Sequence, residues 1–132
     1  MKEKTISQLK KDADAIFSKY IRLKYADPFD ETECCVACGI KKHWKEMHNG
    51  HYESRSFNAT RYHILNCHPE CPKCNIFHEG NKPAYAIYLR RKYGNDVLEI
   101  LHELANTPHQ FTKEELINII NEYKLKVKKY GQ

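Results

Sequence analysis

The 132-residue chain has few glycines and prolines, five of each, and no segment of it repeats another. Hydrophobic residues make up 41% and aromatic residues 11%. This composition excludes a collagen-like chain, a coiled-coil rod and a largely disordered protein. We therefore expect a folded chain, and its length fits a single domain over residues 1–132.

Long hydrophobic runs are also missing. No apolar stretch approaches the roughly 20 residues that a membrane-spanning helix needs. The first seven residues are polar, so we expect neither a secretory signal nor a membrane partner, and we expect a cytoplasmic protein. Paired cysteines in a reducing compartment are more often metal ligands or redox groups than disulfides.

Acidic residues are outnumbered, with 22 Lys and Arg against 17 Asp and Glu, which gives a formal charge of 22 − 17 = +5. A modest positive balance is compatible with a polyanionic partner such as nucleic acid, but it does not require one.

The N-terminal region, residues 5–25, has the three-and-four spacing of apolar residues that is typical of an amphipathic helix. Thr5 and Gln8 have the spacing of a capping box at its start. Asp27 stops it, because a residue that precedes proline avoids the helical conformation.

The C-terminal region, residues 82–132, is predicted to be helical. Pro83 suits a first helical turn and Gly94 suits the position just after a helix end. Thr112 and Glu115 have the spacing of a second capping box, which opens the last helix.

The central region, residues 30–81, contains all six cysteines and six of the eight histidines. Its apolar periodicity is poor, which favours organisation by a bound metal over a large apolar core. We expect short strands over residues 46–52 and 64–68, followed by a helix that starts near Cys74. The predicted fold class is therefore α+β and mostly helical.

Two C-x-x-C knuckles in this region have the spacing of a structural zinc site. Two residues between thiolates let both reach one tetrahedral zinc, and two such turns leave no open coordination position. The predicted ligands of Zn²⁺ are Cys35, Cys38, Cys71 and Cys74. Redox dithiols or unliganded cysteines are the alternative, and Cys34 and Cys67 remain as spare or buried thiols.

Binding of one zinc ion by both knuckles would bring a second group of ligand-type side chains together. These side chains are Glu46, His48, His51, Glu53, Asn66, His68, Asn75, His78 and Glu79. A helix near Cys74 would place Asn75, His78 and Glu79 on one face, because they lie at i, i+3 and i+4. Amide, imidazole and carboxylate groups suit a divalent cation such as Mg²⁺ or Mn²⁺. The alternative is that they satisfy loop backbone groups and cap the short helix.

The two knuckles and the residues between and just after them resemble the motif of a known family. The pattern comprises C-x-x-C-G, then Gly50-His51-Tyr52, then N-x-H-x-x-C-x-x-C-N-x-x-H-x-G-N over residues 66–81. It is similar to an HNH nuclease finger and, more closely, to the phage NinG (Rap) recombination proteins, over roughly residues 20–130.

The resemblance implies a small zinc-clipped ββα-metal finger, flanked here by the N-terminal helix and the C-terminal helices. It implies a metal-dependent DNA endonuclease that prefers branched recombination intermediates such as Holliday junctions and D-loops. It also implies the cytoplasm of a bacterial host, if the chain is phage-encoded. No organic cofactor is expected.

The resemblance also assigns roles to single residues. His51 matches the histidine that deprotonates the attacking water, and Asn66 matches the asparagine that orients this histidine. Asn75 and His78 match the positions that hold the catalytic cation. His68 matches a histidine to which we assign metal or phosphate contact.

One position departs from many HNH fingers, which place a metal ligand just before the general base. Here that position is Gly50, which the NinG relatives share. The first ligand of the catalytic cation is therefore unassigned, and His48, Glu53 and His68 are the candidates.

Basic side chains would hold the DNA backbone through phosphate contacts, reading shape and not bases. The expected DNA contacts are Lys41, Lys42, Lys45, Arg55, Arg61, Arg90, Arg91 and Lys92. A homodimer would suit the two symmetric cuts that a four-way junction needs. Two other functions stay open: a non-catalytic zinc-finger DNA-binding protein, and a zinc-clipped adaptor that binds protein.

Overall fold

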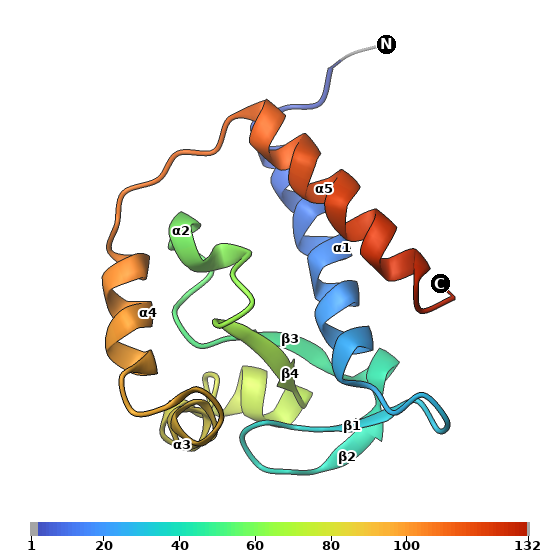
Figure 1. Ribbon diagram of the computed structural model, residues 1–132, viewed down its shortest axis with the longest axis vertical. Helices are drawn as coiled ribbons and strands as arrows, with labels where there is room; N and C mark the ends of the chain where they lie inside the picture. Colours follow the sequence, from blue (N-terminus) through green and yellow to red (C-terminus); the bar gives the residue numbers. More distant parts are fainter. Residues whose placement is uncertain (1–2, 132) are drawn as a thin grey trace.

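The computed structural model describes residues 3–131, and its secondary structure is mostly helical with two small antiparallel hairpins (Figure 1). The helices are α1 (Ile6–Tyr25), α2 (Asn58–Arg61), α3 (Lys82–Tyr93), α4 (Val97–Ala105) and α5 (Lys113–Lys128). The strands are β1 (Thr32–Cys34), β2 (Lys41–His43), β3 (His48–His51) and β4 (Cys67–Glu70). Two short turns of other helix types are η1 (Trp44–Glu46) and η2 (Lys73–Phe77). The predicted mostly helical α+β class is confirmed.

The two long helices, α1 and α5, lie side by side and run in the same direction (Figure 1). Leu9 packs with Leu116 near their starts, and the rings of Phe17 and Tyr123 meet edge to face further along, with centroids 4.8 Å apart. These contacts join residues more than a hundred positions apart in the chain. The N-terminal and C-terminal regions therefore form one packed unit.

The ends of both long helices follow their local capping signals. The side chain of Thr5 accepts a hydrogen bond from the Gln8 N–H, and the Gln8 side chain accepts one from the Thr5 N–H. Thr112 accepts from the Glu115 N–H at the start of α5. The predicted starts of both helices are confirmed. The capping box is complete at α1, whereas α5 has only the bond to the Thr112 side chain.

The central region contains two antiparallel pairs, β1 with β2 and β3 with β4. The strand expected over residues 46–52 is found as β3, whereas its partner lies two to three residues later than expected, over Cys67–Glu70. The β1–β2 hairpin and helix α2 were not predicted, since both are short and lack a periodic pattern.

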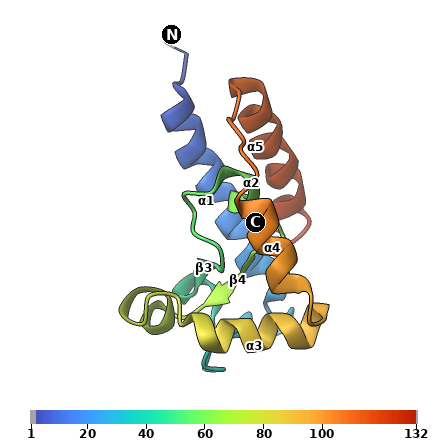
Figure 2. The ribbon, with the colours of Figure 1, turned by 90° about the vertical axis from the view of Figure 1, so that its left-hand side faces the viewer.

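Helix α3 lies along one end of the molecule, and α4 stands beside it (Figure 2). Tyr85 and Leu89 of α3 pack with Val97 and Leu101 of α4. An extended connection over residues 106–112 then carries the chain back to the start of α5 (Figure 1). Within residues 3–131 no helix combines the length and apolar character needed to cross a bilayer.

Candidate functional site

Four cysteine side chains converge in the central region. The Sγ atoms of Cys35, Cys38, Cys71 and Cys74 all lie within 4.8 Å of one another. The Cys38 and Cys71 sulfurs are 3.7 Å apart. A tetrahedral zinc with Zn–S bonds of about 2.3 Å sets its sulfurs about 3.8 Å apart, whereas a disulfide needs about 2.05 Å. The four thiolates therefore fit a structural zinc site, as predicted.

Backbone and side-chain N–H groups point at two of these sulfurs. The Cys74 N–H donates to Cys71 Sγ at 3.5 Å, and Asn81 Nδ2 donates to Cys74 Sγ at 3.5 Å. Asn81 has a left-handed backbone with φ of +46°. Such donors stabilise thiolate charge, so Asn81 supports the metal site without being a ligand.

The two remaining cysteines lie outside this cluster. Cys34 is exposed on β1, and Cys67 is buried on β4 against Phe17 and Ile21 of α1. Burial raises the pKa of the Cys67 thiol, which keeps it neutral. Cys67 therefore acts as a core residue.

A cleft of about 700 Å³ opens between α1, β3 and the chain that follows η2. Ligand-type and basic side chains dominate its polar lining. They are Asp14, Arg22, Lys45, His48, Asn49, His51, Arg55, Asn75, Glu79 and Lys82. Of the expected catalytic and metal-binding residues, this cleft collects His51 and Asn75.

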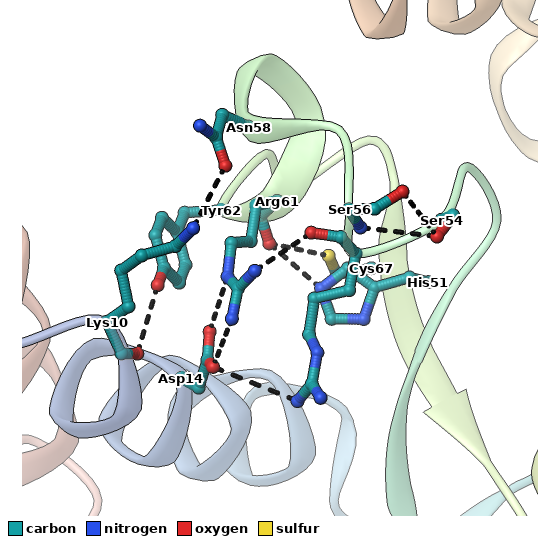
Figure 3. Close-up of polar contacts among 10 residues, drawn as sticks. Lys10, Asp14, His51, Ser54, Ser56, Asn58, Arg61, Tyr62 and Cys67 are labelled. Carbon is teal, nitrogen blue, oxygen red and sulfur yellow. Dashed lines mark hydrogen bonds and ion pairs between the residues drawn. The ribbon is translucent and has the colours of Figure 1, made fainter. Parts of the chain in front are cut away.

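His51, at the end of β3, is oriented by a backbone carbonyl. Its Nε2 donates to the Arg61 carbonyl oxygen at 2.9 Å, as Figure 3 shows. Since a carbonyl only accepts, the proton resides on Nε2 and Nδ1 keeps its lone pair. Burial lowers the pKa of His51 below its usual value of 6.5, so the imidazole is neutral at pH 7.

Asn66 is fully buried and holds the loop that surrounds His51. Its Nδ2 donates to the carbonyls of Glu53 and Thr60, at 3.0 and 3.1 Å, and its Oδ1 accepts from the Glu53 N–H at 2.7 Å. Thr60 precedes Arg61, whose carbonyl orients His51. Asn66 thus positions His51 indirectly, through the backbone and without touching the imidazole.

Asn75 and His48 meet across the cleft wall. Asn75 Nδ2 lies 3.1 Å from His48 Nδ1, which directs the amide nitrogen toward His48 and leaves the amide oxygen for another partner. Glu79 also lines the cleft, four residues after Asn75.

His78 is not brought to the cleft and is exposed on a different surface, beside Phe77 and Asn81. The sequence predicted an α-helix in which residues 75 and 78 share a face. The segment Lys73–Phe77 is instead a π-helix, whose wider turn separates residues three apart. The expectation that His78 holds a cation with Asn75 does not fit this geometry.

His68 lies in the core, away from the cleft. Its Nδ1 is 3.0 Å from the Tyr85 hydroxyl and its Nε2 is 2.8 Å from the Tyr93 hydroxyl, so both nitrogens are engaged. Burial lowers the pKa of His68 to about 3. Tyr85 in turn donates to the Gly50 carbonyl at 2.7 Å. His68 therefore braces β3 through Tyr85, and the expected metal or phosphate contact does not fit.

Glu70 is a residue that the sequence reasoning missed. It is fully buried, and neither carboxylate oxygen has a hydrogen-bond partner among the described residues. A Cβ added to Gly50 would lie only 2.6 Å from Glu70 Cγ and 2.8 Å from its Cδ. The Glu70 carboxyl group therefore fills the space where a side chain at position 50 would start.

Arg61 is already engaged within the protein. Its guanidinium forms a two-pronged ion pair with Asp14 of α1, at 2.9 and 2.5 Å, as Figure 3 shows. Only 13% of the Arg61 side chain is exposed. Arg61 therefore ties the His51 loop to α1, and its expected contact with DNA stays a prediction.

The other expected DNA contacts divide into two groups. Lys45 and Arg55 line the cleft, together with Arg22 and Lys82, which were not predicted. The remaining side chains lie on other surfaces and do not line the cleft: Lys41, Lys42, Arg90, Arg91 and Lys92. Positive charge at the cleft thus comes from four separate parts of the chain.

Comparison with known proteins gives one family. The family model described as "Bacteriophage Lambda NinG protein" matches residues 1–132. No curated protein and no solved structure matches the chain.

Proposed function

Since the chain belongs to the family of the bacteriophage lambda NinG protein, we propose that it is a metal-dependent DNA endonuclease that cuts branched recombination intermediates. The observation that carries the proposal is the state of His51. It is a neutral imidazole at a cleft lined with basic side chains. One nitrogen is held by a carbonyl, and the other has no hydrogen-bond partner among residues 3–131.

His51 is suited to act as general base. Nδ1 takes a proton from a water, and the water oxygen attacks the phosphorus of a phosphodiester while the bond to the leaving oxygen breaks. The Nε2–H stays bonded to the Arg61 carbonyl, which stabilises the imidazolium that forms. The same hydrogen bond keeps Nδ1 from carrying a proton before the reaction.

The donor set of the cleft fits a hard divalent cation, Mg²⁺ or Mn²⁺, because amide and carboxylate oxygens are its preferred protein ligands. Asn75 would hold it through the amide oxygen that the contact with His48 leaves free. Such a cation, when bound, neutralises phosphate charge and assists departure of the leaving oxygen. The thiolate cluster suits zinc, so the two metals would have separate sites and roles.

Basic side chains around the cleft support DNA as the partner. Arg22, Lys45, Arg55 and Lys82 offer cationic groups to phosphates, and no base-reading element is needed for binding by shape. We further propose that two copies act on one four-way junction, each making one of two symmetric cuts.

The direct test is cleavage of supercoiled plasmid and four-way-junction DNA by the zinc-loaded protein. Mg²⁺ or Mn²⁺ should support cutting, and mild chelation should abolish it before zinc is lost. Junction binding is measured on the same samples. Binding without cleavage under any divalent metal would favour a DNA-binding module, and absence of both would favour a protein adaptor.

A further inference from the structure

The buried carboxylate of Glu70 has no structural role visible in its contacts. Its relative exposure is 0%, and both oxygens lack a hydrogen-bond partner within the described part of the chain. Lys82 acts on it only from a distance, since no ion pair joins the two. A buried carboxylate without a partner is strongly unfavourable. A bound cation would offset this cost, so Glu70 qualifies as a cation ligand if its neighbours offer further ligand atoms.

The position of Glu70 on the sheet identifies these neighbours. Glu70 is paired with His48 across β3 and β4, and Gly50 is paired with His68. Paired residues project to the same face, so Glu70, His48 and the open position at Gly50 share one face. The carboxyl group leans from β4 against Gly50, on the face that also carries His68 and His48, and of these residues His48 lines the cleft.

Asn75 approaches this same group of residues. Its side chain contacts His48, and its backbone N–H donates to the Cys71 carbonyl, one residue after Glu70. The amide nitrogen of Asn75 points to His48, and the amide oxygen has no hydrogen-bond partner within the described part of the chain. The amide of Asn75 and the carboxyl group of Glu70 thus both lie next to the four-cysteine cluster and next to His48.

We propose that Glu70 is the carboxylate ligand of the divalent cation that Asn75 holds. It acts from β4 in the place where a ligand at position 50 would otherwise stand. His48 is then a positioning residue that sets the amide of Asn75. The proposal rests on the proposed function for the identity of the site, but it concerns cation binding and not cleavage.

The test measures binding of Mn²⁺ alone to the zinc-loaded protein. The EPR signal of free Mn²⁺ reports how much of the ion is unbound. Glu70→Gln keeps the size of the side chain and removes its charge, so Mn²⁺ affinity should fall at least about tenfold. Glu33→Gln is the matched control. Glu33 is also buried with both oxygens unpartnered among the described residues. It also lies near a cluster cysteine, but it belongs to β1 and is not one of the residues that line the cleft.

Zinc content and thermal melting confirm that each variant is folded. Weaker Mn²⁺ binding in Glu70→Gln, with wild-type binding in Glu33→Gln, supports the proposal even if the protein cuts no DNA. Equal affinity in Glu70→Gln and the wild type overturns it, and so does a wild-type protein that binds no Mn²⁺.

A second pair of variants tests the shared position. Glu70→Ala should lose Mn²⁺ affinity and also vacate the space beside Gly50. The double variant Glu70→Ala with Gly50→Asp places the carboxylate on β3 instead of β4, and it should regain Mn²⁺ affinity. If the double variant binds Mn²⁺ no more tightly than Glu70→Ala, the two positions are not equivalent and the proposal fails.

Discussion

A single hydrogen bond determines what His51 is able to do. The Arg61 carbonyl fixes its tautomer, and burial lowers its pKa below 6.5, so Nδ1 carries no proton at pH 7. Neither property is a feature of histidine alone. Both come from the loop that Asn66 holds around it.

The pH dependence of cleavage should report this burial. The base must be neutral, so activity falls as pH drops through the folded pKa of His51, which is below 6.5. Single-turnover cleavage at saturating Mg²⁺ should therefore keep more than half its maximal rate at pH 6.5. An acid limb with its midpoint above pH 7 would contradict the assignment.

The ion pair between Arg61 and Asp14 makes a separate prediction. Arg61→Ala leaves the partly buried Asp14 carboxylate with only its longer ion pair to Arg55, at 3.8 Å, and it frees the His51 loop from α1. We expect a loss of about 2 kcal/mol in the free energy of unfolding, from the lost charged hydrogen bonds. Chemical denaturation measures it, with the exposed Arg91→Ala as control. An Arg61→Ala protein as stable as Arg91→Ala would show that the pair does not hold the loop.

At the scale of elements, the two C-x-x-C knuckles close the central region. They join the β1–β2 hairpin to the end of β4 and the start of η2, so the short strands depend on the metal for their arrangement. The long helices depend instead on their own packing, through Leu9, Phe17, Leu116 and Tyr123.

Loss of one cluster thiolate should therefore unfold the central region selectively. Structural zinc contributes on the order of 10 kcal/mol of folding free energy in small domains. Cys38→Ser should lose bound zinc. The backbone amide hydrogens of its central loops should exchange rapidly with solvent, while part of the helical circular-dichroism signal persists. Cys34→Ser, next to the cluster but outside it, should keep zinc and stability. Full zinc content in Cys38→Ser would count against the site.

Local signals explain which elements could be predicted from sequence. Thr5 with Gln8 and Thr112 with Glu115 define helix starts through neighbours three residues away. The C-x-x-C spacing predicted the thiolate cluster for the same reason. The π-helix at Lys73–Phe77 has no such signal, and it is the reason that His78 lies on another surface than Asn75.

At the scale of the whole molecule, the cleft depends on contacts between distant segments. Asp14 meets Arg61 across 47 positions, and α5 returns to α1 only through the extended connection over residues 106–112. Helix α1 thus forms one wall of the cleft, and the central region forms the other.

Those distant contacts explain what the sequence could not predict. Nothing next to Glu70 in the chain marks it as buried, and its relation to Gly50 follows only from the pairing of β3 with β4. His68 is embedded among tyrosines of α3, which a pattern of ligand-type residues does not reveal. Arg61 was expected to contact DNA because the sequence does not show that it pairs with Asp14, which lies far away in α1.

The measurement that tests the central claim most directly is single-turnover cleavage of a four-way junction by wild type, His51→Ala and His109→Ala. All three are loaded with zinc and compared at equal junction occupancy. Loss of a general base costs roughly 10²–10⁴ in rate. His51→Ala should therefore lose that much while keeping its junction affinity. His109→Ala should cut like wild type, because the His109 imidazole contacts Glu115 and Phe111 and does not line the cleft. Cleavage by His51→Ala at the wild-type rate would contradict the account.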